Sequence, residues 1–420
     1  MNYEFSEEQL MLRKAARDFL AEECPESLVR ALERSEAGYS LESWRKIADL
    51  GWLGLVYPER YGGSGGNFMD LAVLYEEIGR AMFPGPHLST VVLCGLTILN
   101  AGTEEQKAEI LPRIAGGDLI MALALTEPEA SWDDRAWEPG GVTVRASRSG
   151  NDYVINGTKL FVHDAHIADQ ILCVARTRRG ARPENGITLF LVDAGSPGIG
   201  LTPLRTTAGD KQFEVTFDEV KVPASNIVGK LNGGWSPLWR SIQVGAMMLC
   251  AEMLGAGWRI LEMAVDYAKT RVQFDAPIGV NQYIQGYCTD LVADIDGCQW
   301  LTYHAAWRLS ENLPCDFEVA VAKAWTSEAH ERACLNAHAV LAGVGYTTKA
   351  GILPLYTRRG KTQQLYLGNG SFWRKKVADV IAEWPAPVRP RGKPLGLWNK
   401  PPEEAVPVWP VWKKEDFSDS

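Results

Sequence analysis

The chain has 420 residues and lacks paired cysteines, long hydrophobic runs and an excess of positive charge. None of its eight cysteines stands in a Cys-x-x-Cys pair, which is the usual signature of a zinc site or a redox dithiol. Most cysteines have apolar neighbours, which predicts buried and reduced thiols. No apolar run approaches the roughly 20 residues that span a bilayer, so we expect no membrane span.

The charge balance is acidic, with a formal net charge of −9. Nucleic-acid binding usually needs a basic face, so we expect no nucleic-acid partner. The balance does not exclude a phosphorylated small ligand, for which a local basic pocket suffices. The first six residues contain neither the basic segment nor the apolar core of a secretory signal, and this predicts a cytoplasmic protein.

Signatures of common catalytic and metal sites are missing as well. His163 and His166 are three residues apart, but no carboxylate or cysteine follows at the spacing of metal ligands. The other histidines are isolated, and a structural role is expected for His87, His304, His330 and His338. We therefore expect no metal. The chain also lacks a nucleophile elbow, a P-loop and a Rossmann fingerprint.

Residues 1–118 have a helical pattern. Ser6 and Gln9 fit a capping box, after which apolar residues return at helical spacing. Further helices are predicted near residues 41–50, 69–81 and 104–115, and the glycine-rich loop after Pro58 interrupts them. This region is predicted to form an N-terminal helical domain.

Residues 119–229 alternate between apolar and polar positions. Short strands are predicted at 142–144, 153–155, 171–175, 187–192 and 213–217. Five or more strands without intervening helices favour a small barrel or sandwich. Residues 230–383 are helical again, with an apolar stripe from Leu254 to Ala268 and a later helix at 317–341 that ends near Gly343. The predicted fold class is α+β, in the order helices, β-domain, helices.

Residues 384–420 differ from the rest because they are rich in proline and tryptophan. Proline at this density precludes a regular helix, and a disordered tail is usually poor in aromatic residues. We predict an extended arm that packs on its own or a neighbouring subunit.

Six segments, in order, resemble motifs of the acyl-CoA dehydrogenase family, and the resemblance covers the chain up to about residue 383. They are Pro58–Gly63, Leu125–Pro128, Tyr153–Lys159, Tyr267–Phe274, Gln282 and Ala342–Tyr346. Each motif is weak alone, but all six lie on the expected structural types. Glu76–Ala81 and Pro84–Pro86 are similar to the bacterial subgroup that acts on bulky or cyclic acyl-CoA, including steroid side chains.

The resemblance implies a fold, a reaction and a cofactor. The fold is an N-terminal helical domain, a central β-barrel-like domain and a C-terminal four-helix bundle, in a dimer or tetramer with FAD at the subunit interface. The reaction is α,β-dehydrogenation of an acyl-CoA thioester, with an electron-transfer flavoprotein or an equivalent acceptor. The implied FAD contacts are Leu125, Thr126, Phe161, His163, Arg271, Phe274, Gln282, Gly343 and Gly345.

The implied substrate side departs from the family pattern at the catalytic base. The implied substrate contacts are Gly245, Tyr366, Leu367, Gly368 and Arg374. Leu367 stands where the family usually has its glutamate, and Asn369 stands where some relatives have an aspartate. The alternative base position of other relatives falls on Gly245, so neither position carries a carboxylate. Glu252 and His163 are the remaining candidates for acid–base chemistry, with Asn369 as a third.

The flavin side also departs from the family. Phe161-Val162-His163 replaces a tryptophan and a hydroxyl residue, Asp275 replaces a glycine, and Ala339 replaces a glutamine. The small residues Gly245 and Ala246 suggest a roomy, apolar pocket for a ring.

Four functions remain open. The first is an FAD-dependent dehydrogenase with a relocated base, and the second is one subunit of a hetero-oligomer whose partner supplies the base. The third is a non-redox hydratase, hydrolase or lyase on an acyl-CoA, and the fourth is a non-catalytic binding protein.

Overall fold

The computed structural model of the protein describes residues 4–130, 137–347 and 351–383. The chain up to Val380 forms one compact unit. Of the second unit, which starts at Ile381, the described residues contain only the end of the last helix. The arm expected at 384–420 lies outside the described residues.

The N-terminal region is helical, as predicted. Its α-helices are α1 (Glu7–Glu23), α2 (Glu26–Arg34), α3 (Leu41–Asp49), α4 (Phe68–Ala81), α5 (Leu96–Ala101) and α6 (Glu104–Ala115). The capping box of α1 is confirmed: the Ser6 hydroxyl accepts from the Gln9 N–H, and the Gln9 side chain accepts from the Ser6 N–H. Helices α2 and α5 and a π-helical stretch at Leu88–Gly95 were not predicted. The π-helical stretch is buried on nearly every side, so it has no amphipathic period to detect.

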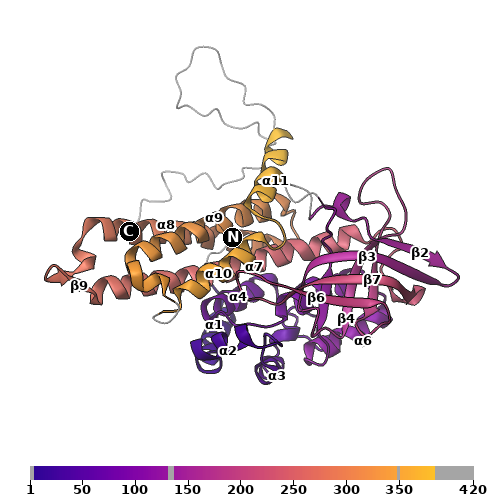
Figure 1. Ribbon diagram of the computed structural model, residues 1–420, viewed down its shortest axis with the longest axis horizontal. Coiled ribbons are helices and arrows are strands. Elements are labelled where there is room, and N and C mark those ends of the chain that lie inside the picture. The colour runs from indigo at the N-terminus through magenta and orange to yellow at the C-terminus, as the bar shows by residue number, and fades with distance from the viewer. Residues whose placement is uncertain (1–3, 131–136, 348–350, 384–420) are drawn as a thin grey trace, which may run out of the picture. The chain divides into compact units, whose positions relative to one another are not determined.

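The central region forms one eight-stranded sheet (Figure 1). Its strands are β1 (Met121–Ala124), β2 (Arg145–Ser149), β3 (Asp152–His163), β4 (Gln170–Arg176), β5 (Ile187–Asp193), β6 (Ile199–Leu204), β7 (Gln212–Pro223) and β8 (Ile227–Val228). They follow the order β6-β7-β3-β2-β4-β5-β8, and β1 pairs with β4. The strand expected at 142–144 begins instead at Arg145, because Val142 and Val144 belong to the buried segment that leads into it.

A bulge in β3 positions the strand end that matters for the site. The antiparallel register between β3 and β7 shifts between Lys159 and Val162, and Phe161 has a φ of +54°. Beyond the bulge the pairing resumes, with His163 opposite Gln212 at the start of β7. Bulges of this kind redirect side chains and are frequent next to active sites.

The C-terminal region consists of long helices. They are α7 (Trp235–Thr270), α8 (Gln282–Ser310), α9 (Asp316–Leu341), α10 (Leu353–Leu365) and α11 (Gly370–Glu383), with a hairpin of β9 (Val272–Gln273) and β10 (Ala276–Pro277) after α7. Helices α7, α8 and α9 run side by side (Figure 1). By length and composition α7 could cross a membrane, but 89% of its apolar window is buried inside the protein, as in a core helix.

Helices α4 and α7 cross with their backbones in contact. A β-carbon on Gly79 would lie 1.9 Å from the Glu252 carbonyl oxygen, and one on Gly255 would lie 1.7 Å from the Glu76 carbonyl oxygen. Only glycine permits this approach. The crossing therefore fixes the backbone of Glu252 against α4.

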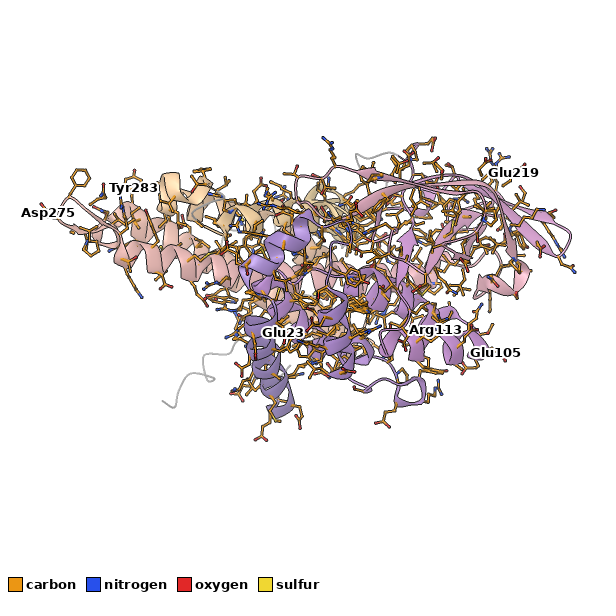
Figure 2. All side chains as sticks on the ribbon, turned by 60° about the horizontal axis from the view of Figure 1, so that its bottom comes forward. Glu23, Glu105, Arg113, Glu219, Asp275 and Tyr283 are labelled. Atoms are coloured by element: carbon orange, nitrogen blue, oxygen red, sulfur yellow. The ribbon has the colours of Figure 1, made fainter. Side chains whose placement is uncertain are left out.

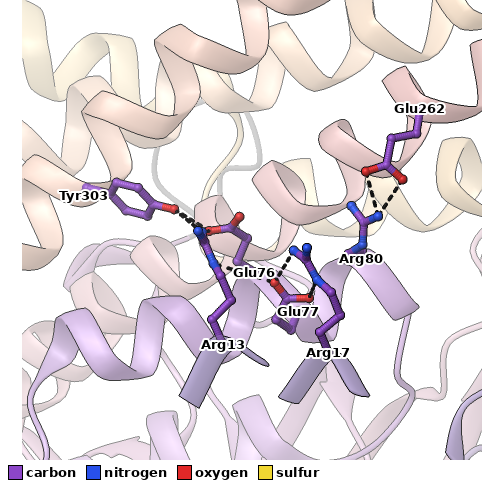
Figure 3. A network of polar contacts seen from close by, with 7 residues as sticks. All are labelled: Arg13, Arg17, Glu76, Glu77, Arg80, Glu262 and Tyr303. Atoms are coloured by element: carbon purple, nitrogen blue, oxygen red, sulfur yellow. Dashed lines mark hydrogen bonds and ion pairs between the residues drawn. The ribbon is translucent and has the colours of Figure 1, made fainter. Parts of the chain in front are cut away.

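A buried polar network ties α1 to α4 and α8 (Figure 3). Arg13 pairs with Glu76 at 2.7 Å, and Tyr303 of α8 also donates to the Glu76 carboxylate. Arg17 donates twice to Glu77, at 2.7 and 2.9 Å. Because both glutamates are buried, their charges need these partners. The network holds α4, one wall of the cavity described next.

Candidate active site

A cavity of about 150 Å³ lies where α4, the end of β3, α7 and α10 meet. Its wall includes His163, Glu252 and Tyr366, so three residues singled out in the sequence are brought together. It also includes Asp164, Asp210 and Arg359, which sequence reasoning did not select.

His163 is held between an aromatic ring and a carboxylate. Its imidazole packs on the Tyr366 ring, with centroids 4.0 Å apart and an interplanar angle of 37°. Its Nδ1 lies 3.7 Å from Oδ2 of Asp210. Trp137 contacts the same tyrosine edge-on at 5.5 Å. The ring of His163 is therefore oriented from two sides.

Asp210 is fixed as an acceptor. Thr206 Oγ1 and Gln212 Nε2 each donate to its carboxylate at 2.5 Å. Burial raises the pKa of Asp210, but the neighbouring His163 and the Thr206 and Gln212 hydrogen bonds outweigh burial, and the pKa ends below its ordinary value. An ionised carboxylate therefore faces the imidazole.

Asp164 and Glu252 are two further carboxylates of the cavity wall. Ser89 Oγ donates to Asp164 at 2.7 Å, and burial raises the pKa of Asp164 against the opposing effects of His163 and Ser89. Burial also raises the pKa of Glu252, opposed by the Arg359 charge and a hydrogen bond from Gln363. Both groups are expected to take up protons more readily than a carboxyl in water.

Arg359 faces the cavity from α10 without a direct carboxylate partner. Its guanidinium donates to the carbonyls of Met82 at 2.6 Å and Phe83 at 3.2 Å, just beyond the end of α4. Within the described ranges no carboxylate oxygen lies within 4.0 Å of it. Its charge is balanced only at longer range, by Glu252 and Asp210.

The two positions at which the family resemblance places a base lie against each other, and both are apolar. A β-carbon on Gly245 would lie 2.7 Å from Leu367 Cδ1 and 2.8 Å from Leu93 Cδ2. Leu367 is fully buried and has a φ of +58°. The room expected beside Gly245 is therefore absent, because two leucines fill it.

A buried lysine holds the Leu367 turn in place. Lys323 Nζ donates to the carbonyls of Gln363, Gln364 and Gly368, at 2.8, 3.0 and 3.3 Å. The first two are carbonyls of the last turn of α10, which helical hydrogen bonds leave unpaired. Lys323 thus caps α10 and positions the residues that follow it.

Of the expected substrate contacts, Tyr366 lines the cavity, whereas Gly245, Leu367, Gly368 and Arg374 do not, and neither does Asn369. The Asn369 side chain accepts from the Phe372 N–H at 2.8 Å and caps the start of α11. Arg374 pairs with Glu328 at the surface. Gly368 has a φ of +103° and lies under Phe372, a position that requires glycine.

Of the residues expected on the flavin side, His163 lines the cavity, whereas Leu125, Thr126 and Phe161 are not part of its wall. Leu125 and Thr126 are buried, and Thr126 Oγ1 donates to the Leu160 carbonyl at 2.5 Å. Glu127 forms a fully buried ion pair with Lys159 at 2.6 Å. This pair joins two of the family motifs and supports the strand that leads to the β3 bulge.

The other expected cofactor residues lie at the far end of the helical bundle. Figure 2 shows Asp275 of the β9–β10 hairpin and Tyr283 of α8 at the opposite end from Glu219 of β7. Phe274 at the hairpin tip is 99% exposed, and Arg271 at its base is also exposed. Gln282 opens α8, and Gly343 and Gly345 follow α9. Along α7, Arg271 is about 39 Å from Gly245, at about 1.5 Å per residue.

This division has a consequence for a dinucleotide cofactor. The expected cofactor residues divide between strands β1 and β3 with the turn after β1, and the outer end of α7 and the start of α8. The exposed cation of Arg271 suits a pyrophosphate, and among the described residues no ion pair includes it. The residues therefore fit FAD if two copies of the chain share each site. In the described ranges no cluster of three or more His, Cys, Asp or Glu side chains could hold a metal.

Two signals in the sequence could have revealed the missed residues. Arg359 precedes Tyr366 by seven residues, which is two helical turns, a spacing that would place both on one side of a helix. Asp164 directly follows the candidate His163. No local signal connects Asp210 with His163, because their contact depends on the pairing of β3 with β7.

Comparisons with known proteins identify the family of the chain. Models of the acyl-CoA dehydrogenase N-terminal, middle and C-terminal domains match residues 6–118, 122–220 and 232–382. The chain is 31% identical to the probable acyl-CoA dehydrogenase YngJ of Bacillus subtilis, over 90% of this chain and 99% of that protein. It is 31% identical to the caffeyl-CoA reductase-Etf complex subunit CarC of Acetobacterium woodii, with the same coverage.

The fold of the chain is also similar to that of a solved structure. A chain of the ChsE4-ChsE5 complex from Mycobacterium tuberculosis superposes with a TM-score of 0.83 at 28% identity, covering 92% of this chain and all of the other. The predicted fold class and its order of helices, sheet and helices are confirmed. The chain belongs to the acyl-CoA dehydrogenase family of FAD-dependent enzymes, as its motifs predicted.

Proposed function

We propose that the protein catalyses FAD-dependent α,β-dehydrogenation of an acyl-CoA thioester with a bulky or cyclic acyl group, and that His163 replaces the usual glutamate base. The observation that supports this most is the His163–Asp210 pair in the cavity wall, packed on Tyr366 next to Leu367. Glu252 lies about 10 Å further along α7 from the alternative base position at Gly245, so His163 is the better placed of the two.

The roles of the residues follow from their contacts. Asp210 faces Nδ1 of His163, which leaves Nε2 to take the α-proton of the thioester. The ionised Asp210 keeps the imidazole oriented and stabilises the imidazolium that forms. Leu367 and Leu93 fill the space beside Gly245 and exclude water from it. FAD, when bound, accepts the β-hydride.

The cofactor contacts are proposed to come from two copies of the chain. Thr126, Phe161 and His163 of one copy would meet the flavin end, and Arg271 and the Gly343–Gly345 turn of the other would meet the phosphate end. The reduced enzyme would pass its electrons to an electron-transfer flavoprotein or an equivalent acceptor. The similarity to a subunit of an Etf complex supports this partner.

An anaerobic spectral titration of the purified protein tests the proposal. We expect cyclohexanecarboxyl-CoA, a cyclic thioester, to bleach the flavin absorbance. His163→Gln should retain the flavin and lose bleaching by about 10²- to 10⁴-fold in rate, the usual contribution of a general base. Equal bleaching rates in the variant and the natural protein would exclude His163 as the base.

A second candidate function is that of one subunit in a hetero-oligomer. The apolar packing of Leu367 against Gly245 and the similarity to a chain of the ChsE4-ChsE5 complex support it. In this case bleaching should require a co-encoded homologue, and His163→Gln should leave the rate of the mixed enzyme unchanged.

A further inference from the structure

We infer that the end of the cavity formed by Arg359 and Glu252 recognises a hydroxyl group on the acyl part of the substrate. This inference rests on the proposed function in one respect, namely that the cavity receives the acyl group. It goes further by assigning the chemical class of that group.

Arg359 provides an underused donor. A guanidinium has five N–H groups, and the two carbonyls of Met82 and Phe83 account for only part of them. The side chain lines the cavity, and in the described part of the chain no carboxylate oxygen approaches it within 4.0 Å. An oxygen atom of a ligand can therefore accept from it.

Glu252 provides an acceptor on the same wall. Glu252 is 8% exposed, and its backbone position is fixed because Gly79 of α4 packs directly against its carbonyl. Gln363, which follows Arg359 by one helical turn on α10, lines the same cavity as Glu252. Helix α10 thus contributes both the donor Arg359 and a second polar side chain to the wall that contains the acceptor.

Two further polar groups of this wall, Tyr75 and His87, are already paired with each other. Tyr75 and His87 Nδ1 share a hydrogen bond of 2.8 Å, and His87 Nε2 lies 3.3 Å from the Trp52 carbonyl. Burial lowers the pKa of His87 to about 4, so this ring is neutral at neutral pH. The charged groups that face a ligand here are Arg359 and Glu252, with Asp210 and Asp164 further along the wall. Glu33 and Lys211 also line the cavity, but Glu33 pairs with Arg358 at 2.7 Å and Lys211 donates to the Glu33 carbonyl.

The charges of the wall discriminate among ligand classes. An unsubstituted ring would displace water from Arg359 and Glu252 without forming hydrogen bonds to them. Leaving buried polar groups without hydrogen-bond partners is unfavourable for binding. A carboxylate would pair with Arg359 but face three carboxylates, and an ammonium group would face Arg359. A hydroxyl can accept from Arg359 and donate to Glu252 at once. The pocket is therefore suited to a hydroxylated acyl group rather than to the purely apolar ring expected from Gly245 and Ala246.

The test compares matched CoA thioesters by equilibrium binding and by flavin bleaching. The panel is cyclohexanecarboxyl-CoA, its 3- and 4-hydroxy derivatives, and the 4-carboxy derivative. Dissociation constants are measured by calorimetry on the flavin-loaded oligomer. We expect at least one hydroxylated thioester to bind ten times or more tighter than the unsubstituted one, and the carboxylated thioester to bind more weakly than either.

Variants locate the preference in the cavity. The quantity compared is the affinity for the hydroxylated thioester divided by the affinity for the unsubstituted one. Glu252→Gln and Arg359→Met should each reduce this ratio to near one. Glu262→Gln removes a carboxylate from the same helix outside the cavity, where it pairs with Arg80, and should keep the ratio. Circular dichroism and flavin content report whether each variant is folded.

Equal affinity for the unsubstituted and hydroxylated thioesters, a preference for the carboxylated one, or a ratio that survives both cavity variants would overturn the inference. The binding data are independent of turnover. A panel that binds with the expected ratio but never bleaches the flavin would contradict the proposed dehydrogenation and leave the hydroxyl preference standing.

Discussion

Gly245 packs directly against the side chain of Leu367, so closely that a β-carbon on Gly245 would lie 2.7 Å from Leu367 Cδ1. The two positions at which relatives carry a catalytic carboxylate therefore compete for one space in this protein. The family resemblance implies a base at one position or the other. The packing explains why both cannot carry one, because there is room for only one long side chain. Here that side chain is a leucine, and the carboxylates that line the cavity come from other positions of the chain.

Leu367→Glu is expected to introduce a base without crowding Gly245, because glutamate is no wider than leucine at the β- and γ-carbons. We expect faster flavin bleaching by cyclohexanecarboxyl-CoA than in the natural protein. Leu367→Gln is the matched control, since it has the same shape and cannot take up a proton. A gain that appears equally in both variants would show that polarity, not basicity, is responsible.

Gly245→Glu should fail where Leu367→Glu succeeds. The new side chain overlaps Leu367 and Leu93, and overpacking a core typically costs about 1–3 kcal/mol. We expect a lower urea midpoint and no gain of activity. Combining it with Leu367→Gly should recover most of the lost stability. An undiminished midpoint in the single variant would contradict the packing described here.

Arg271→Ala is expected to lower FAD occupancy, because a charge-assisted contact to the pyrophosphate is lost. The flavin-to-protein absorbance ratio after purification and the dissociation constant for added FAD measure the effect. Lys269→Ala removes an exposed cation of the same helix end and should leave both values unchanged. Equal losses in the two variants would point to general charge rather than to a phosphate site.

The protein is expected to be a dimer or tetramer, since the expected cofactor residues divide between the sheet region and the outer end of α7, a helix that extends about 39 Å from Gly245 to Arg271. Light scattering should give at least twice the mass of one chain. Phe274→Asp, at the fully exposed hairpin tip, should weaken association and release FAD together. A flavin-loaded monomer would refute the shared site.

Lys323 should make stability depend on pH in the alkaline range. Burial lowers the pKa of Lys323 to about 8 from 10.5, so between these values the unfolded chain binds a proton that the folded chain does not. The free energy of unfolding contributed by this group therefore rises with pH across the window, by about 3 kcal/mol at 1.36 kcal/mol per pKa unit.

Urea unfolding of the natural protein and Lys323→Met at pH 7.5, 8.5 and 9.5 measures this effect. The variant is expected to be less stable throughout, because the carbonyls of Gln363, Gln364 and Gly368 lose their donor. The gap between the two proteins should widen as pH rises. A gap that stays constant would mean that Lys323 is charged in the folded protein throughout.

The sequence by itself determined the order of the elements and the family. Caps such as the Ser6–Gln9 box, the alternation of the strands and the six motifs are local patterns, and each depends on neighbours within a few residues. The absence of a carboxylate at Gly245 and Leu367 was equally visible, because it needs only the identity of two residues.

Only the tertiary structure decided what replaces that carboxylate. His163 lies next to Asp210 because β3 pairs with β7, and Glu252 and Arg359 line one cavity because α10 packs beside α7. Likewise, the sequence predicted open space beside Gly245, whereas Leu367 and Leu93 fill that space in the fold. Contacts between residues so distant in the chain leave no local period or spacing, so the chemistry of the cavity emerges only when the helices and the sheet are packed together.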